Sequence, residues 1–184
     1  VPRVAETQDG LLNSIGLQNA GAKHFIENDI PFLRQYDTKI IVNICGHTLA
    51  QYCSVAEKFA DCDIDLLELN ISCPNVEEGG LSFGTDPHIV ERIVGAVRHY
   101  AKQPLIVKLS PEVSDITEIA KAAVSGGADA ISLINTLRGM KIDIHKRKPV
   151  LANRIGGYSG PGIMPVALRM VYEVCHSVDV PVIG

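Results

Sequence analysis

The chain has 184 residues, of which 46% are hydrophobic and 21% charged, and its formal net charge is −4. This composition is typical of a globular domain with a sizeable core, and it argues against long disordered segments. Trp is absent and only 5% of the residues are aromatic, which argues against a base-stacking nucleic-acid surface. We interpret the basic cluster at residues 145–148 as a solvated loop.

The sequence contains no apolar run near the roughly 20 residues of a membrane span, and residues 1–10 do not resemble a signal peptide. Its five cysteines are odd in number and none has C-x-x-C spacing, so we expect neither a disulfide framework nor an iron–sulfur cluster within this chain. These features predict a protein of a reducing compartment, the cytoplasm. Because the first residue is Val, we expect the natural amino terminus to lie upstream.

Strand-like apolar runs alternate with helix-like stretches along the chain. A weak strand candidate at residues 11–17 is followed by stronger ones at 39–45, 64–70, 104–109, 129–135 and 180–184. Helices are expected at residues 48–60, 86–100, 114–125 and 162–177. Thr48, Asp86 and Ser114 are expected as amino-terminal caps, and Gly126 and Gly127 as the end of the third helix. This alternation predicts parallel strands joined by right-handed crossovers.

Four consecutive predicted strands carry a polar side chain at or near their carboxyl ends: Asn43, Asn70, Lys108 and Asn135. In a (β/α)₈ barrel these ends meet at one active-site mouth, whereas in an open sheet they meet only at a switch point. We therefore favour an α/β fold of the TIM-barrel type. Such a barrel typically needs about 250 residues. The six strand candidates predict an incomplete barrel that lacks its first and last strands.

The segment Asn-Ile-Ser-Cys-Pro-Asn at residues 70–75 carries the most chemical information, because a cysteine follows a strand end on a polar loop. Free cysteines more often pack in the core, but the neighbours of Cys73 are polar or proline. A thiol on such a loop can act as a base when its surroundings set a suitable pKa. Cys73 is therefore our candidate base.

Lys108 lies inside an apolar strand, where an unpaired charge is costly. Its head group either extends to water or provides a fixed cation for an anionic ligand or a reduced cofactor, and its position at the strand end favours the second interpretation. Asn135 and Thr136 are turn formers in many proteins, but their alignment with the other strand ends favours ligand contact.

Two glycine-bearing loops are weaker signals. Residues 156–161 precede the last predicted helix, where backbone NH groups often bind phosphate. Residues 13–19 by themselves indicate only a turn.

Five motifs that occur in order carry a family resemblance: residues 13–19, 70–75, 107–111, 135–136 and 157–161. Together they resemble the catalytic subunit of class 1 dihydroorotate dehydrogenases over nearly the whole chain. The NAD-linked 1B branch is the most similar, because Thr136 follows Asn135 and cysteine occupies the position of the base. The resemblance implies that residues 1–184 form a single FMN-binding barrel domain that oxidises dihydroorotate to orotate in pyrimidine (UMP) biosynthesis.

The resemblance also implies roles for individual residues. Cys73 would remove the C5 proton of the substrate while the C6 hydride passes to flavin N5, and Lys108 would stabilise the reduced flavin. Asn43 and Asn70 would hydrogen-bond flavin, substrate or both, and Ile134 and Gly160 would contact FMN through backbone groups. Orotate would be held by Asn13, Ser14, Ile15, Gly16, Leu17, Asn70, Asn135 and Thr136, with Asn75 nearby.

The same resemblance implies a homodimer and a partner subunit that carries FAD and a [2Fe–2S] cluster and reduces NAD. The family's first-strand lysine has no counterpart here, and the phosphate loops that normally follow Pro-Val-Ile-Gly are missing, so we expect a fragment of a longer enzyme. Two alternatives stay open. One is a dihydropyrimidine dehydrogenase-type oxidoreductase, and the other is a non-catalytic barrel remnant that serves in binding or assembly. No metal site is expected.

Overall fold

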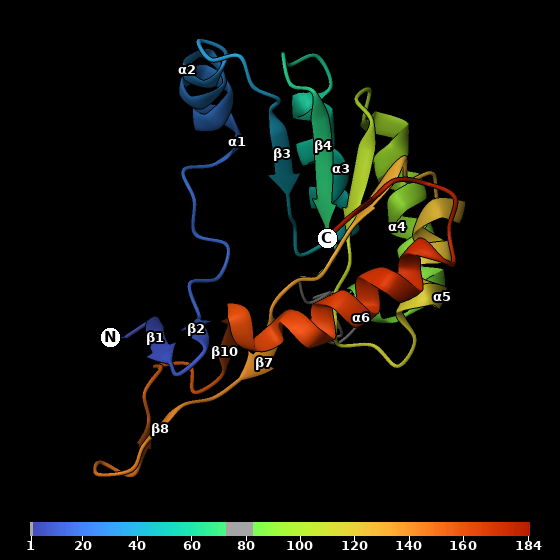
Figure 1. The fold of residues 1–184 in the computed structure, drawn as a ribbon. Helices are drawn as coiled ribbons and strands as arrows, with labels where there is room; N and C mark the ends of the chain where they lie inside the picture. The colour runs from blue at the N-terminus through green and yellow to red at the C-terminus, as the bar shows by residue number, and fades with distance from the viewer. Residues whose placement is uncertain (1, 73–82) are drawn as a thin grey trace.

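The computed structural model describes residues 2–72 and 83–184, and its main body is a parallel five-stranded sheet (Figure 1). The strands are β3 (Ile41–Ile44), β4 (Leu66–Asn70), β5 (Leu105–Lys108), β6 (Ala130–Ser132) and β11 (Val182–Ile183). They lie in the order β11-β6-β5-β4-β3, and every neighbouring pair is parallel. The sheet order follows the chain order, as in the wall of a (β/α)₈ barrel, which confirms the predicted fold class.

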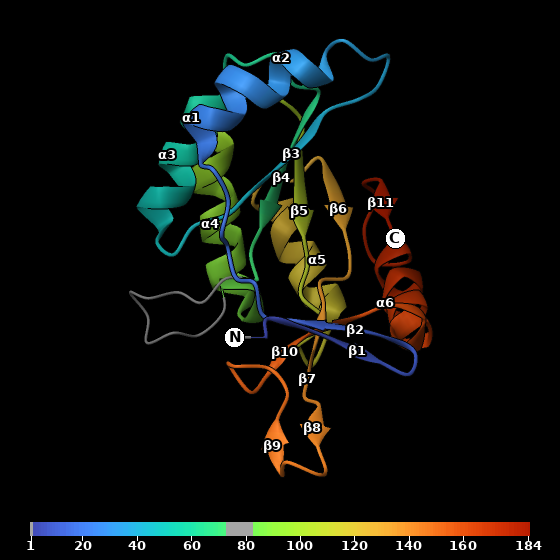
Figure 2. The same ribbon diagram turned by 90° about the vertical axis from the view of Figure 1, so that its left-hand side faces the viewer.

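Helices α3 (Leu49–Phe59), α4 (Pro87–Tyr100) and α5 (Ile116–Ser125) cover one face of this sheet (Figure 2), and α6 (Met164–Cys175) packs against α5 and β11. Thr48 and Asp86 cap α3 and α4 as predicted. The predicted cap at Ser114 is wrong, because Asp115 caps α5. Its Oδ1 accepts hydrogen bonds from the backbone N of Thr117 at 2.8 Å and from its Oγ1 at 2.7 Å.

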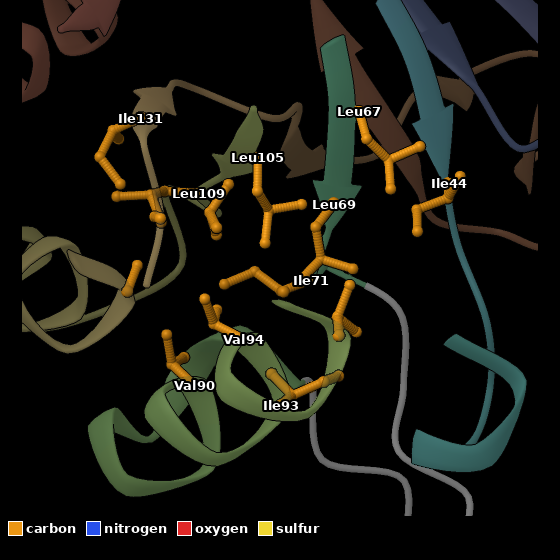
Figure 3. Packing of buried hydrophobic residues seen from close by; sticks show 14 of the residues in the cluster. Ile44, Leu67, Leu69, Ile71, Val90, Ile93, Val94, Leu105, Leu109 and Ile131 are labelled. Atoms are coloured by element: carbon orange, nitrogen blue, oxygen red, sulfur yellow. The ribbon is translucent and has the colours of Figure 1, made fainter. Parts of the chain in front are cut away.

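The core lies between the sheet and these helices (Figure 3). Leu67 and Leu69 of β4 are fully buried on the helix side of the sheet and belong to the same hydrophobic cluster as Val94 of α4. Alternate residues of β4 point to the opposite face, which no helix of the described residues covers and which corresponds to the barrel interior. The alternation thus separates an apolar packing face from the face that carries the polar strand-end residues.

A second, antiparallel sheet lies at the carboxyl ends of the parallel strands (Figures 1 and 2). It consists of β1 (Val4–Thr7), β2 (Gly10–Asn13), β10 (Gly156–Ser159) and β7 (Leu137–Gly139), in that order. The expectation of a barrel strand at residues 11–17 is therefore wrong, since β2 forms a hairpin with β1 through a tight turn at Gln8 and Asp9. The described residues contribute five barrel strands, one fewer than the six expected.

Short elements complete the described chain. Residues 145–147 form the exposed turn of a protruding hairpin between β8 (Ile142–Asp143) and β9 (Lys148–Pro149), in agreement with the solvated loop expected there. The remaining elements are α1 (Ala22–His24), a π-helical turn (Phe25–Asp29), α2 (Ile30–Leu33) and two 3₁₀ turns (Phe83–Thr85 and Pro161–Ile163). Within the described ranges, no helix is both long and apolar enough to cross a membrane.

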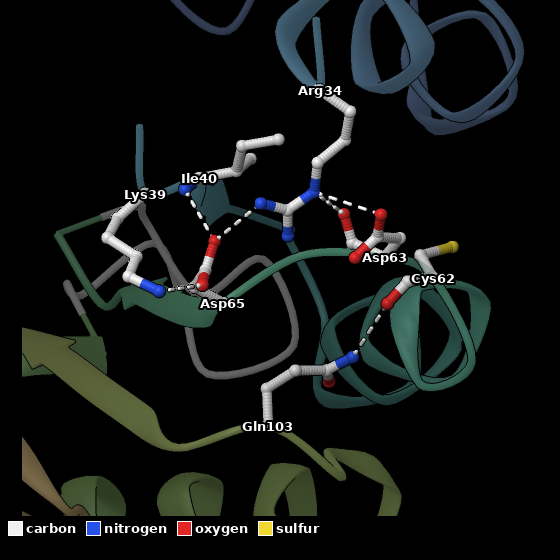
Figure 4. A network of polar contacts seen from close by, with 7 residues as sticks. All are labelled: Arg34, Lys39, Ile40, Cys62, Asp63, Asp65 and Gln103. Carbon is white, nitrogen blue, oxygen red and sulfur yellow. Dashed lines mark hydrogen bonds and ion pairs between the residues drawn. The ribbon is translucent and has the colours of Figure 1, made fainter. Parts of the chain in front are cut away.

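A polar network ties α2 to the amino end of the sheet, on the side away from the small antiparallel sheet (Figure 4). The Asp65 carboxylate, just before β4, accepts from the Ile40 backbone N at 2.9 Å and contacts Lys39 Nζ and Arg34 Nη1 at 3.0 Å each. The hydrogen bond from Ile40, followed by that from Lys39, lowers the pKa of Asp65 to about 2. Arg34 also bonds the backbone and the side chain of Asp63. This end of the barrel is therefore fixed by ion pairs and hydrogen bonds.

Candidate active site

The uncovered face of the sheet brings the predicted strand-end residues into one row. Asn70 of β4 is directly paired with Lys108 of β5, and Lys108 is paired with Ser132 of β6. Asn43 lies on the neighbouring strand β3, in register with Glu68. The parallel register therefore assembles the amides and the ammonium group at one edge, as the sequence pattern indicated, and adds the hydroxyl of Ser132.

Three hydrogen bonds hold Asn70 in place. Its Oδ1 accepts from the backbone N of Ser72 at 3.1 Å and from Nδ2 of Asn135 at 3.2 Å, and its backbone oxygen accepts from the Tyr52 hydroxyl at 2.6 Å. Because its Oδ1 already accepts two bonds, the Nδ2 group of Asn70, which has no partner among the described residues, is left to donate to a ligand. Asn135 is itself fixed, since its Oδ1 accepts from the backbone N of Thr136 at 2.7 Å.

Lys108 is half-buried at the end of β5. Within residues 2–72 and 83–184, no acceptor lies within hydrogen-bond or ion-pair distance of its Nζ. A partly buried ammonium without an acceptor is an electrostatic cost that a bound anion can offset. The geometry is thus suited to an anionic ligand in front of β5.

Glu68 is a member of the row that the sequence analysis missed. Its Oε2 accepts from Asn43 Nδ2 at 2.5 Å, and its Oε1 accepts from Ser132 Oγ at 2.6 Å. A charged residue two positions before Asn70 in an otherwise apolar strand was the available signal, because residues i and i+2 share a face.

The small antiparallel sheet places a second group of predicted residues at the carboxyl edge of the parallel sheet. Asn13 at the end of β2 is paired with Gly157 of β10, and its Nδ2 lies 3.5 Å from the Gly157 carbonyl oxygen. A Cβ atom built on Gly157 would lie 2.2 Å from Oγ1 of Thr136, so only glycine permits this approach. The structure therefore brings together Asn13 and Thr136, which are 123 positions apart in the numbering.

The residues after Asn13 are accessible. Ile15, Gly16 and Leu17 are exposed, and Gly16 has a φ angle of 76°. Among the described side chains, the hydroxyl oxygens of Ser14 and Ser72 are buried and have no hydrogen-bond partner. A buried hydroxyl without a partner costs free energy, so both positions are suited to contacts with a ligand.

The glycine loop before the last helix differs from the expectation. Residues 156–159 form strand β10, and their backbone pairs with β2 and β7 instead of pointing at a helix terminus. A Cβ atom on Gly160, which has a φ angle of 116°, would lie 2.7 Å from Cα of Gly10. These glycines therefore serve close packing of the small sheet. Ile134 follows β6 and is half-buried against the core.

Two predicted site residues, Cys73 and Asn75, lie outside the described residues. Ser72 and Phe83 mark the two ends of the described chain around them. Among the described residues, no group of three His, Cys, Asp or Glu side chains could hold a metal ion.

The available groups fit a planar ligand with ring NH and C=O groups and a negative charge. Amide groups lie on two neighbouring strands and a cation lies on the third. The buried hydroxyl of Ser72, which has no partner among the described residues, belongs to a residue whose backbone N bonds Asn70. Both a reduced, anionic isoalloxazine ring and a pyrimidine carboxylate have this pattern of groups.

Comparisons with known proteins agree with this chemistry. A family model described as Dihydroorotate dehydrogenase matches residues 1–184. The chain is 69% identical over 183 residues to a protein of Alkaliphilus metalliredigens named "Dihydroorotate dehydrogenase B (NAD(+)), catalytic subunit", with 100% of this chain and 61% of the relative covered. A protein of the same name from Lachnoclostridium phytofermentans is 58% identical over 184 residues, again with 100% and 61% covered. The chain thus spans about three fifths of the length of these relatives.

Proposed function

We propose, starting from the fact that this chain belongs to the dihydroorotate dehydrogenase family, that the complete protein oxidises dihydroorotate to orotate in pyrimidine biosynthesis. The observation that carries the proposal is the row of Asn70, Lys108 and Asn135 at the carboxyl edge of the parallel sheet. This edge holds amide and ammonium groups, and Cys73 follows Asn70 by three positions in the sequence.

In this proposal, Cys73 takes the proton from C5 of dihydroorotate. FMN, when bound, supplies the hydride acceptor for C6, so that loss of the proton and the hydride creates the C5–C6 double bond. Lys108 provides a fixed positive charge near the acceptor and stabilises the negative charge that develops there. Asn43 and Asn70 orient the rings through their amides, and Ile134 and Gly160 contribute backbone groups to the cofactor side.

The substrate side is assigned to the second group of residues. Asn135 and Thr136 bind the pyrimidine ring and its carboxylate, together with the loop from Asn13 to Leu17 and with Asn75. The closeness of Asn13 and Thr136 across Gly157 supports this assignment, because one ligand can contact both segments. We further propose that residues 1–184 belong to a single FMN-binding barrel domain.

The test uses the complete protein. Anaerobic addition of dihydroorotate should bleach the absorbance of bound flavin and produce orotate, with slower or no reduction by dihydrouracil. Faster reduction by dihydrouracil would favour the dihydropyrimidine dehydrogenase-type alternative. A pure protein that binds no flavin would instead indicate a non-catalytic barrel.

The electron acceptor is part of the proposal. The relatives' names include NAD(+) and "catalytic subunit", so we propose NAD as final acceptor and a partner subunit that carries FAD and a [2Fe–2S] cluster. NAD reduction by the complete protein should require that subunit, and NAD reduction without it would contradict this part. We also propose a cytoplasmic homodimer, to be checked by light scattering.

A further inference from the structure

Glu68 connects three strands on the uncovered face of the sheet. It lies in the middle of β4, two positions before Asn70, and its neighbours Leu67 and Leu69 point into the core. One carboxylate oxygen accepts from Asn43 on β3, and the other accepts from Ser132 on β6. Since β5 lies between β4 and β6, the Glu68 side chain spans the sheet across β5.

The two hydrogen bonds fix which atoms of Asn43 face the mouth. Both carboxyl oxygens of Glu68 accept hydrogen bonds, so Asn43 presents Nδ2 to Glu68. If the Asn43 amide were flipped, its Oδ1 would lie against a carboxylate oxygen without a hydrogen between them. Asn43 is exposed, so its Oδ1 remains available as an acceptor on the solvent side.

Neighbouring strand ends therefore display different hydrogen-bonding groups. Asn43 offers an acceptor on β3, Asn70 offers an Nδ2 donor on β4, and Lys108 offers a cation on β5. The Asn43 acceptor and the Asn70 donor match a ring edge in which an N–H lies beside a C=O group. This edge occurs in the pyrimidine portion of a flavin and in dihydroorotate and orotate.

We propose that Glu68 is a positioning residue, which holds the Asn43 amide so that its carbonyl oxygen accepts from a ring N–H of the bound ligand. The inference rests on the proposed function for the identity of the ligands. It adds an acidic residue that acts through Asn43 and does not itself touch the ligand.

A comparison of Glu68→Leu with Glu68→Gln separates the effect of the Asn43 amide orientation from the effect of the Glu68 charge. In Glu68→Leu the exposed Asn43 amide loses its fixed orientation, and binding should weaken about tenfold, the size of one lost hydrogen bond. In Glu68→Gln, Oε1 can still accept from Asn43 while Nε2 donates to Ser132 Oγ, because a hydroxyl can reverse its role. Affinity in Glu68→Gln should stay within about threefold of the wild type, since the Asn43 bond is kept.

Two affinities of the complete protein should be measured. The FMN dissociation constant of the apoprotein follows from quenching of flavin fluorescence, and the orotate dissociation constant of the holoprotein follows from the flavin spectrum. Whichever affinity falls in Glu68→Leu identifies the ring that Asn43 contacts. Ser132→Ala is the matched control, because it removes the other hydrogen bond to Glu68 and leaves the one from Asn43.

A double-mutant cycle tests whether Glu68 acts through Asn43. If it does, the double variant Glu68→Leu with Asn43→Ala should bind no more weakly than Asn43→Ala alone. Additive losses would overturn the proposal, as would equal losses in Glu68→Gln and Glu68→Leu, or unchanged affinities in Glu68→Leu.

Two further outcomes separate a folding defect in Glu68→Leu from a failure of the proposed function. If Glu68→Leu does not fold, the exposed substitution Asn43→Ala decides, because unchanged binding of both ligands in that variant would overturn the proposal. If the wild type bound FMN but did not oxidise dihydroorotate, the proposed function would fail, while the coupling of Glu68 and Asn43 in FMN affinity would still be measured.

Discussion

Asn135 donates a hydrogen bond of 3.2 Å to the side-chain oxygen of Asn70, a residue 65 positions earlier in the chain. Replacing Asn135 with Asp removes the donor and places a carboxylate beside that oxygen. We expect orotate binding to weaken by about 1–3 kcal/mol, the cost of a lost bond together with an unsatisfied polar group. Titration of the holoprotein with orotate measures this loss. The same substitution at the exposed Asn28 is the control, and equal affinities in the two variants would remove Asn135 from the site.

Cys73 should be required for turnover and dispensable for flavin binding. Cys73→Ala is expected to lower kcat by roughly 10²–10⁴, the usual contribution of a general base, with a wild-type flavin content. The rate of flavin reduction in an anaerobic stopped-flow experiment is the measurement. Cys53→Ala is the control, because Cys53 lies on α3 and burial raises the pKa of its thiol. Rates close to wild type in Cys73→Ala would remove Cys73 as the base.

Lys108 should contribute to cofactor chemistry more than to folding. Since its ammonium group has no acceptor among the described residues, Lys108→Met should leave the thermal midpoint of the apoprotein unchanged or raise it. The same variant should hold flavin more weakly or reduce it more slowly. Lys102→Met, which removes an exposed ion pair with Asp61, is the control. An unchanged reductive half-reaction in Lys108→Met would contradict the proposed role.

Asp65 should stabilise the fold at neutral pH and lose this effect in acid. Its pKa is lowered to about 2 in the folded protein from an ordinary value of 3.8. The stabilisation is therefore complete above about pH 4 and is lost as the pH falls toward 2. Asp65→Asn should lower the urea midpoint at pH 7, and the difference from wild type should shrink below pH 4. Asp179→Asn, at an exposed position, is the control, and a difference that is constant with pH would contradict the expectation.

Gln103 should stabilise the folded protein through its hydrogen bonds to carbonyl groups at the carboxyl end of α3. Its buried Nε2 lies 2.9 Å from the Phe59 carbonyl oxygen and 3.2 Å from that of Ala60, at the carboxyl end of the helix (Figure 4 shows a third contact, to Cys62). Gln103→Met leaves the Ala60 carbonyl without a partner among the described residues, while the Phe59 carbonyl keeps its bond from the backbone N of Cys62. We therefore expect a loss of about 1–3 kcal/mol in the free energy of unfolding. Urea titration measures it, and an unchanged midpoint would show that water replaces the amide.

The parallel sheet was predictable because buried parallel strands have continuous apolar runs and their order follows the chain. The cap at Asp115 was missed because Ser114 and Asp115 are both good capping residues, and only the backbone geometry decides between them. The hairpin of β1 and β2 was missed because its two turn residues, Gln8 and Asp9, are not a usual hairpin pair, and Gly10 already belongs to β2. Local sequence favours a strand there, but tertiary pairing determines which sheet that strand joins.

For the site, the alternation along β4 and β5 was enough to predict that Asn70 and Lys108 share one face. The contacts between strands were not predictable, because they depend on register and on side-chain reach. Glu68 illustrates this limit, since its partners Asn43 and Ser132 are 25 and 64 positions away. The packing role of Gly157 against Thr136 likewise depends on a distant segment.

The small antiparallel sheet also determines when the substrate side can form during synthesis. Asn13 leaves the ribosome before its partner Gly157, which is 144 positions later. At about 5–20 residues per second, the delay between them is on the order of ten seconds. Throughout this interval the nascent chain exposes an unpaired β2 edge, which other chains can pair with. Chaperone binding to the segment around β2 during translation would protect that edge until β10 is available.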